Sequence, residues 1–427
     1  MLSPNFRTMI LILLPTMALL LGGCVHTGAD LTLAEAIGLI EGGNVIEPSP
    51  AVAKAILKKY QDRPILIEFS ATWCIICKGI KRPLDHLAQE GKGRYIIMRL
   101  DVTDDMETLV EYGMKPIYPS FKLFSPGLVQ PVKRFGLLSF DSLIAWMRLT
   151  HTTIQNVPLQ FSQAPLKTPK AVIVAGSAEN ANFAQEVVWI TKILKRKGLK
   201  DDEMACFYAK PDPVQYLADQ KQFDELAHDL NKCSATSRLA ILNATKQGLA
   251  ANPSTFFLYA TSHGAGPSEY RPEKGERDCF TRAPSLILDN GSEEYCDSLN
   301  HLTPDAVASA VPAVSPTHKF MVFQSCYSGG FISDQNNAAK YPSALAKLPN
   351  MTLLTATRSD RPSFGCGTGE IATYYGFSFA KALEEDRGTF ESIDWKTINQ
   401  ETIESIEQLE SKSQIREGSD PQFFNGL

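Results

Sequence analysis

Short apolar runs alternate with amphipathic stretches along most of the chain, which is typical of strands alternating with helices. In the first part we predict strands at 65–70, 95–101, 121–124 and 132–135, and helices beginning at Cys74 and covering 104–112 and 140–149. The order strand-helix-strand-helix-strand-strand-helix indicates one compact α/β domain over residues 51–150.

A linker rich in proline and polar residues, 151–169, separates this domain from a second block at 170–390. Strands are predicted there at 171–175, 204–209, 255–261, 319–324 and 351–356, with helices around 183–194, 239–249 and 371–383. Nearly continuous apolar strands that alternate with helices indicate a mostly parallel sheet covered on both faces, a three-layer α/β/α domain. We expect residues 391–427, which are polar, to form a C-terminal tail.

Length and charge narrow the class of protein. A chain of 427 residues suggests two or three domains. Its 42 basic and 47 acidic residues leave a net charge of −5, with no basic block. The sequence therefore offers no electrostatic support for binding nucleic acid.

The N-terminus reads as a signal peptide over residues 1–23. The apolar run Met9–Leu21 is too short to span about 30 Å of hydrocarbon and follows the basic residue Arg7. It leads into Leu21-Gly-Gly-Cys24, which resembles the bacterial lipoprotein signal, cut before a lipid-bearing cysteine. The alternative is an ordinary secretory signal with a chance cysteine.

Lipidation of Cys24 would make residues 24–50 a tether to the membrane. Val25, rather than Asp, after the cysteine favours sorting to the outer membrane over the inner one. The resemblance thus implies a bacterial cell-envelope protein that is lipid-anchored and faces the periplasm. In either case the mature chain works where thiols tend to oxidise.

The first candidate site is Cys74-Ile-Ile-Cys77, where a strand hands over to a helix. A helix N-terminus favours the thiolate of Cys74, which becomes the attacking sulfur, and Cys77 resolves the mixed disulfide. Glu68 lies on the preceding strand, where a buried carboxylate could take the proton of the second thiol. The alternatives are a structural disulfide and half of a zinc site, but no second ligand pair is nearby.

The run from Glu68 through Trp73 to Lys78 resembles the thioredoxin superfamily over about 100 residues. The resemblance includes Tyr118-Pro119, where that family keeps a cis proline beside its active site. It implies a redox-active disulfide at Cys74 and Cys77, supported by Glu68, Trp73 and Pro119. Between the cysteines the chain has Ile-Ile instead of Gly-Pro, so redox potential, direction of exchange and partner stay open.

The second candidate site pairs His263 with Cys326. Each follows a buried apolar strand, and open α/β sheets place reactive groups at the carboxyl ends of strands. A histidine beside a cysteine can activate the sulfur and then protonate a leaving amine, as acyl transfer requires. Glycines after each residue allow backbone N–H groups to approach an oxyanion.

The residues around this pair resemble the caspase signature and, more specifically, the legumain family of caspase-fold cysteine peptidases. Four segments occur in that family's order, Val174–Ser177, Ser262–Gly264, Ser325–Gly329 and Thr355–Ser363, with Thr373–Gly376 beyond. The resemblance implies a caspase-like fold with Cys326 as nucleophile and His263 as general acid and base. It also implies the Gly264 and Cys326 amides as oxyanion donors, polypeptide substrates, and no metal or other cofactor.

Specificity carries over less well. Where legumains bind asparagine through charged residues, this chain has Ala184-Gln185, Gln324 and Phe377, so we predict no asparaginyl specificity. The insertion after Gly264 carries Arg271, Arg277 and Arg282, which either rim the cleft or belong to a solvated loop.

Five further cysteines are unassigned: Cys206, Cys233, Cys279, Cys296 and Cys366. A disulfide between Cys279 and Cys296 would close the insertion, although spacing alone does not prove pairing. For Cys366 the alternatives are a structural thiol, which we favour, and an oxidation partner of Cys326.

The leading interpretation is a lipid-anchored cysteine peptidase or transpeptidase whose thioredoxin-like domain keeps Cys326 reduced, supplied by an unidentified thiol-disulfide electron donor. The main rival is a thiol-disulfide oxidoreductase whose second domain only binds client proteins. A third is an envelope scaffold with both sites degenerate, which the intact cysteine and histidine residues disfavour.

Overall fold

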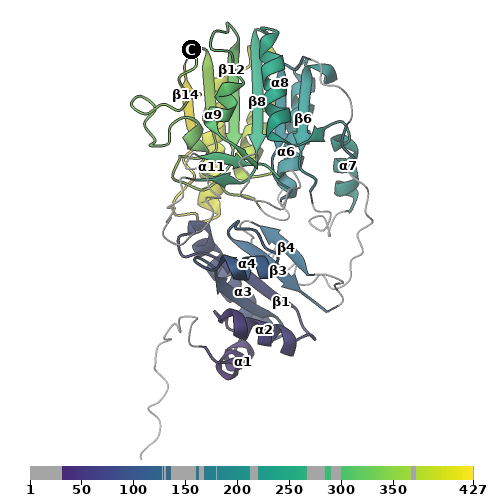
Figure 1. Ribbon diagram of the computed structural model, residues 1–427, viewed down its shortest axis with the longest axis vertical. Helices are drawn as coiled ribbons and strands as arrows, with labels where there is room; N and C mark the ends of the chain where they lie inside the picture. Colours follow the sequence, from purple (N-terminus) through teal and green to yellow (C-terminus); the bar gives the residue numbers. More distant parts are fainter. Residues whose placement is uncertain are drawn as a thin grey trace, which may run out of the picture.

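The computed structural model describes residues 31–126, 128, 131–135, 160–162, 168–178, 180–211, 220–266, 284–289, 300–366 and 372–426. They form two α/β domains stacked along the long axis of the molecule (Figure 1). The predicted signal peptide, most of the linker and the predicted helix at 140–149 lie outside the described residues. No helix within the described ranges is both long enough and apolar enough to cross a bilayer.

The N-terminal domain is built on a four-stranded sheet in the order β2-β1-β3-β4. Its strands are β1 (Ile65–Ser70), β2 (Ile96–Asp101), β3 (Ser120–Phe124) and β4 (Val132–Phe135), and its helices are α1 (Leu33–Glu41), α2 (Pro50–Lys59), α3 (Ile75–Gly91) and α4 (Met106–Glu111). β1 pairs in parallel with β2 and antiparallel with β3. All six residues of β1 are buried, including Glu68 and Ser70 among its apolar residues.

Residues 31–50, which belong to the predicted tether, pack on this domain instead of extending from it. Leu31, Ala36, Ile40 and Ile46 are buried in its core. Ile46 also forms a bridge to Met98 on β2. The described part of the predicted tether is therefore a folded element, because its apolar residues have a hydrophobic surface to cover.

The second domain holds a seven-stranded sheet in the order β14-β13-β12-β8-β5-β6-β7. Its strands are β5 (Ala171–Ala175), β6 (Met204–Tyr208), β7 (Ser234–Ala235), β8 (Thr255–Thr261), β12 (His318–Gln324), β13 (Met351–Thr355) and β14 (Gln422–Asn425). All neighbouring pairs are parallel except β13 with β14. A separate small sheet contains β9 (Gly264–Ala265), β10 (Ser285–Ile287) and β11 (His301–Leu302).

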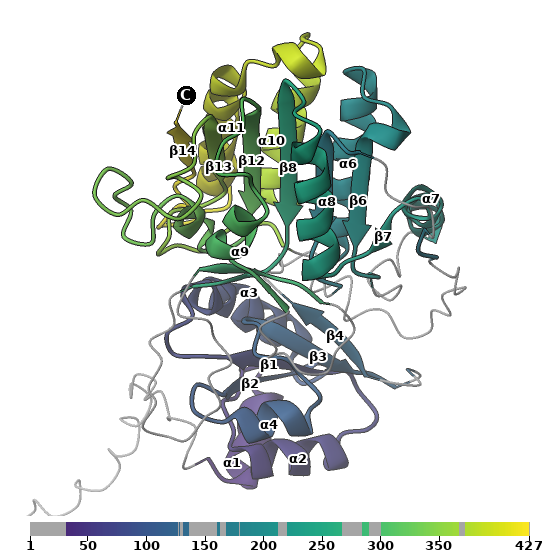
Figure 2. The same cartoon turned by 45° about the horizontal axis from the view of Figure 1, so that its top comes forward.

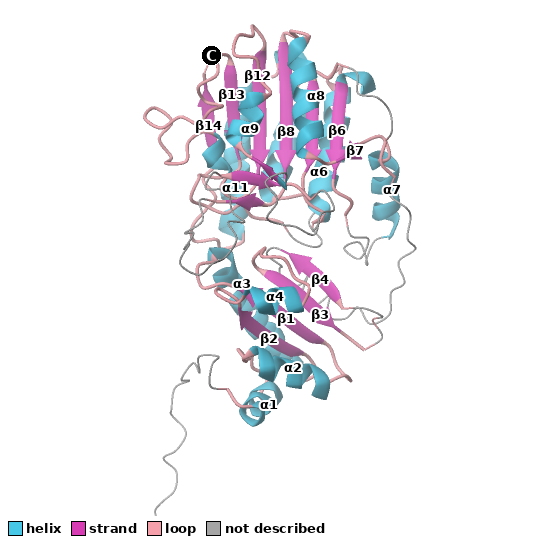
Figure 3. Ribbon diagram, viewed as in Figure 1, coloured by secondary structure: helices cyan, strands magenta, loops and turns pink. Residues whose placement is uncertain are grey.

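Helices cover both faces of the large sheet, and Figure 3 shows the layers. Their bounds are α6 (Ala181–Arg196), α7 (Gln220–Leu230), α8 (Arg238–Ala250), α9 (Pro304–Ser309), α10 (Tyr374–Glu385) and α11 (Trp395–Lys412), with short 3-10 turns at Asp201–Glu203, Ser328–Phe331 and Phe390–Ser392. One core joins α6, α7, α10 and α11 to the sheet, and the other joins α8 and α9 to the opposite face. The predicted fold class is confirmed: a thioredoxin-like domain precedes a three-layer α/β/α domain with a mostly parallel sheet.

The C-terminal residues differ from the tail that we predicted. Helix α11 buries Trp395, Ile398 and Ile406, and β14 adds the antiparallel edge strand. Most other positions of α11 are polar, so its apolar stripe is narrow. The prediction of a tail at 391–427 was wrong, because so narrow a stripe can be recognised as a packing face only when α10 and the sheet that it covers are known.

The carboxyl ends of β8 and β12 point toward the N-terminal domain (Figure 1). Figure 2 shows the small sheet, drawn in green, between the large sheet and the N-terminal domain. The arrangement places the strand ends that carry His263 and Cys326 on the side of the second domain that faces its neighbour.

Candidate functional site

Cys74 and Cys77 form a disulfide at the N-terminus of α3. Cys74 caps the helix, and its Sγ accepts a hydrogen bond from the amide of Cys77 at 3.0 Å. Both residues are 5% exposed. The cap brings Cys74 Sγ to the end of the helix where the backbone N–H groups stabilise negative charge, as the sequence predicts for an attacking thiolate.

Glu68 is fully buried on β1, and its Oε2 accepts a hydrogen bond from Arg99 Nε at 2.6 Å. Burial raises the pKa of this carboxyl to about 7, against the opposing effect of the Arg99 charge. Its Oε1 has no hydrogen-bond partner among the described residues. A carboxyl that titrates near neutral pH is suited to exchange a proton with a thiol, although no described contact joins it to Cys77.

Trp73 precedes Cys74 in the chain, and Pro119 follows Tyr118, which packs beside the disulfide. The Tyr118–Pro119 peptide bond is cis. The Tyr118 ring packs against Cys74 and Cys77 and meets the Trp73 ring edge-on, with centroids 5.3 Å apart. Trp73 is 57% exposed, so an aromatic surface lies next to the redox centre.

The ends of β8 and β12 bring His263 and Cys326 to neighbouring positions. The parallel register pairs Thr261 with Gln324, and the amide of Ser262 donates to the Gln324 carbonyl oxygen at 3.0 Å. Continued by two residues, the same register sets His263 beside Cys326. A methyl group added to Gly264 would lie 1.9 Å from the Cys326 carbonyl oxygen, so the two backbones are in close contact and only glycine fits.

Cys326 is partly exposed and forms no disulfide. Its Sγ accepts a hydrogen bond from the Ser363 amide at 3.3 Å. Desolvation raises the pKa of the Cys326 thiol to about 11, although the Ser363 N–H and its own N–H act in the opposite direction. In the resting protein the sulfur is therefore a thiol, and a base must remove its proton when it attacks.

His263 is 8% exposed, and its ring meets the edge of the Phe183 ring with centroids 5.2 Å apart. Asn180 Nδ2 lies 3.3 Å from His263 Nε2. We did not select Asn180 from the sequence. The available signal was an asparagine just before a helix that follows the first strand of the sheet; its role depends on α6 starting beside the end of β8.

The turn after Cys326 is held by the loop after β13. Tyr327 adopts a left-handed conformation with φ of 60°, and its amide donates to the Arg361 carbonyl oxygen at 2.9 Å. The amide of Ser328 donates to Thr357 Oγ1 at 3.0 Å. These bonds fix the backbone around the sulfur, which is a requirement for the predicted oxyanion donors Gly264 and Cys326.

The residues at the legumain specificity positions lie largely inside the protein. Ala184 is buried in the core. Gln324 is fully buried; its Oε1 accepts from Thr261 Oγ1 at 2.6 Å and its Nε2 donates to Ser363 Oγ at 3.1 Å. The Phe377 ring meets Trp189, with centroids 5.9 Å apart. Because the Gln324 amide is engaged internally, it is not presented to a substrate.

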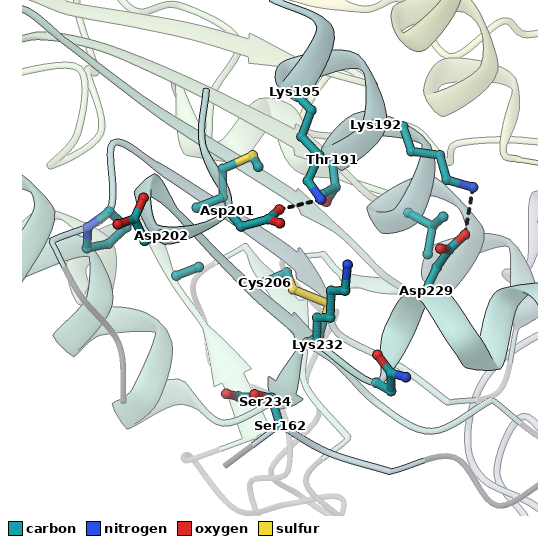
Figure 4. A pocket seen from close by; sticks show the side chains of 16 residues that line it. Ser162, Thr191, Lys192, Lys195, Asp201, Asp202, Cys206, Asp229, Lys232 and Ser234 are labelled. Carbon is teal, nitrogen blue, oxygen red and sulfur yellow. Dashed lines mark ion pairs between the residues drawn. A yellow bond between two sulfur atoms is a disulfide. The ribbon is translucent and has the colours of Figure 1, made fainter. Parts of the chain in front are cut away.

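Cys206 and Cys233 form a second disulfide, a pairing that the sequence left open. It lines a pocket of about 460 Å³ beside α6 and β6 (Figure 4). Two ion pairs lie at this pocket: Lys192 with Asp229, and Lys195 with Asp201. The pocket contains neither His263 nor Cys326, so we assign it no catalytic role.

Of the other cysteines and arginines that the sequence singled out, only Cys366 lies among the described residues. Cys366 is free and partly exposed. Cys24, Cys279, Cys296 and the three arginines of the insertion lie outside the described residues. Within the described ranges, no cluster of three or more histidine, cysteine or acidic residues is placed to hold a metal ion.

Comparison with known proteins identifies the N-terminal domain. The family model described as Thioredoxin matches residues 48–148. Thioredoxins of Pseudomonas aeruginosa and Rickettsia conorii are 34% and 31% identical over 86 residues, which cover 20% of this chain and 78% and 80% of theirs. Through this domain, the chain belongs to the thioredoxin family. The CxxC disulfide and the cis proline of the structure lie within the matched range.

Solved structures give weaker likenesses. Chloroplastic thioredoxin z is 19% identical, with a TM-score of 0.23, and covers 24% of this chain and 91% of its own. Caspase-1 from Spodoptera frugiperda is 11% identical, with a TM-score of 0.37, and covers 66% of this chain and 95% of its own. Both TM-scores are low, so we assign neither a fold nor an activity from them.

Proposed function

We propose that this protein is a cell-envelope cysteine peptidase whose thioredoxin domain keeps the catalytic sulfur reduced. The proposal for the second domain rests chiefly on one observation: the β8–β12 register brings His263 and Cys326 to adjacent strand ends, with the Gly264 backbone against that of Cys326. Tethering through a lipid on Cys24, at the outer membrane, is the matching proposal for location.

In the proposed reaction His263 takes the proton of the Cys326 thiol as the sulfur attacks the carbonyl carbon of a peptide bond. The Gly264 and Cys326 amides stabilise the oxyanion of the tetrahedral intermediate. Protonated His263 then gives its proton to the leaving amine, and a thioester remains on Cys326. Water releases the acid and regenerates the thiol, or a second amine takes the acyl group and forms a new peptide bond.

The raised pKa of Cys326 supports this order of events. A thiol with a pKa of about 11 is almost entirely protonated at neutral pH, so attack must be coupled to proton transfer to His263. The contact with Asn180 limits the orientations open to the imidazole during that transfer.

The thioredoxin match over residues 48–148 supports a redox role for the N-terminal domain. A Cys74 thiolate attacks the oxidised sulfur of a client, Cys77 attacks the mixed disulfide, and the Cys74–Cys77 disulfide forms as the client thiol leaves. A peptidase thiol outside the cytoplasm is exposed to oxidants, so Cys326 is the client that we propose.

Labelling with a thiol-directed peptide electrophile tests the peptidase half. The reduced full chain should gain the mass of the probe on Cys326, and the His263→Ala variant should not. The control variant is Lys54→Glu, which changes an exposed side chain of the thioredoxin domain and should leave labelling unchanged. Equal labelling of wild type and His263→Ala, or none on Cys326 in either, would contradict the proposal.

The rival function is a thiol-disulfide oxidoreductase whose second domain only binds clients. The observation that favours it is the Cys74–Cys77 disulfide within the range that matches thioredoxins. Under this alternative the Cys74→Ser variant loses disulfide exchange on added proteins, and no peptide electrophile labels Cys326 in any variant.

A further inference from the structure

An ion pair joins the two domains. Lys115 Nζ lies 3.2 Å from Asp289 Oδ2, with side-chain exposures of 37% and 15%. Lys115 follows α4 in the thioredoxin domain, and Asp289 follows β10 in the second domain. Figure 2 shows the small sheet, to which β10 belongs, next to the thioredoxin domain.

On the thioredoxin side, Lys115 lies close in the chain to residues that contact the redox centre. Lys115 lies four residues before cis-Pro119, in a tight segment where the Ile117 amide donates to the Lys115 carbonyl oxygen at 2.8 Å. The next residue, Tyr118, packs on Cys74 and Cys77. Lys115 therefore belongs to the same loop as Tyr118, which contacts the disulfide.

On the other side, the pair is linked to the backbone of His263. The Ile287 amide of β10 donates to the His263 carbonyl oxygen at 2.9 Å, and Leu286 pairs with Gly264 across β10 and β9. The amide of Asp289 donates to the Gly176 carbonyl oxygen at 2.6 Å. Asp289 is therefore held on the same backbone that forms the candidate peptidase site.

We infer that the Lys115–Asp289 pair is the docking contact through which the thioredoxin domain presents its dithiol to Cys326 of the same chain. The inference rests on the redox part of the proposed function and does not require peptide-bond cleavage. Because the domains share one chain, the reaction is intramolecular and its rate is independent of protein concentration.

The chemistry begins with Cys326 blocked as a mixed disulfide with a small thiol. The Cys74 thiolate attacks Cys326 Sγ, a Cys74–Cys326 bond forms, and the small thiol leaves as a thiolate. The Cys77 thiolate then attacks Cys74 Sγ and expels Cys326, which takes up a proton. The dithiol is oxidised to the Cys74–Cys77 disulfide, and the mixed disulfide is reduced to two thiols.

Replacing Cys77 by serine prevents the second step and traps the first product. The full chain carrying Cys77→Ser is reduced, freed of reductant and treated with diamide, a thiol oxidant, at one fixed concentration that exceeds every protein concentration tested. After acid quenching, peptide mapping by mass spectrometry follows the Cys74–Cys326 link over time. We expect this link to form with first-order kinetics.

Charge reversals in this background test the docking contact. Lys115→Glu and Asp289→Lys should each slow the link about fivefold, because they replace an attraction between partly exposed charges by a repulsion. The double reversal should restore the rate to within about twofold, which would show that the double variant folds and that the losses depend on the signs of the two charges. Lys54→Glu, which breaks an exposed pair with Glu111 in the same domain, is the matched control and should leave the rate unchanged.

Four results would overturn the inference. Unchanged rates in both single reversals, or no recovery in the double reversal, would mean that the pair does not guide docking. A rate that rises with protein concentration would mean that the link forms between chains. Absence of the link in every variant would also remove the redox role, whereas electrophile labelling of Cys326 would still report on the peptidase half.

Discussion

The state of the Cys326 sulfur at rest is the most direct quantity to measure. Burial raises its pKa to about 11, and the Ser363 N–H at 3.3 Å only partly offsets this. The thiolate fraction is then about 0.001 at pH 8 and about 0.09 at pH 10, so the rate of alkylation by iodoacetamide should rise about ninetyfold. A thiol with an ordinary pKa near 8.5 would gain only about fourfold over this range.

The assay follows alkylation of the Cys326 peptide by mass spectrometry in the reduced full chain, with circular dichroism at each pH to verify the fold. Glutathione in the same tube reports on an ordinary thiol. A Cys326 rate that levels off between pH 7 and pH 9 would refute the reasoning, because it would reveal a preformed thiolate. His263 would then hold the proton before substrate arrives.

Three further predictions concern both domains. For Glu68→Gln, the free energy of unfolding relative to wild type should rise by about 3 kcal/mol from pH 4.5 to pH 8. The raised pKa means that the folded Glu68 carboxyl keeps its proton up to about pH 7, whereas the unfolded one loses it near pH 4.5. The wild type therefore loses stability as pH rises through this window, and the glutamine variant does not. Hydrogen exchange of β1 amides measures it, and parallel pH profiles would contradict it. Gly264→Ala should lower electrophile labelling of Cys326 at least about tenfold, since the methyl group overlaps the Cys326 carbonyl; Gly38→Ala, with open space around it, is the control, and equal losses would argue against the close contact. Asn180→Ala should slow the same labelling about fivefold, the worth of one neutral hydrogen bond; an unchanged rate would show that the amide does not position the imidazole.

Continuous apolar runs made the central strands predictable. β1, β5 and β8 have the predicted bounds, because strands buried on both faces are apolar at most positions. The pattern failed where burial is one-sided. Helices α7 and α11 carry many charges, and their narrow apolar stripes can be recognised only when the surfaces that they cover are known.

Contacts between residues far apart in the sequence could not be predicted for the same reason. Cys206 and Cys233 are 27 residues apart, and the spacing of five cysteines allowed several pairings. The parallel pairing of β6 with β7 brings Cys233 beside the strand that carries Cys206. Likewise, the contact of Asn180 with His263 joins a helix start to a strand end 83 positions away.

The sequence by itself determined the chemical groups and their local settings: the CxxC at the start of a helix, and a histidine and a cysteine each at the end of an apolar strand. These follow from periodicity over a few residues. Only the tertiary structure decided that β8 and β12 are neighbours in a register that aligns His263 with Cys326. It also decided that Lys115 meets Asp289 between the domains. Strand order and domain docking depend on contacts between surfaces far apart in the chain, and local patterns do not encode which surface meets which.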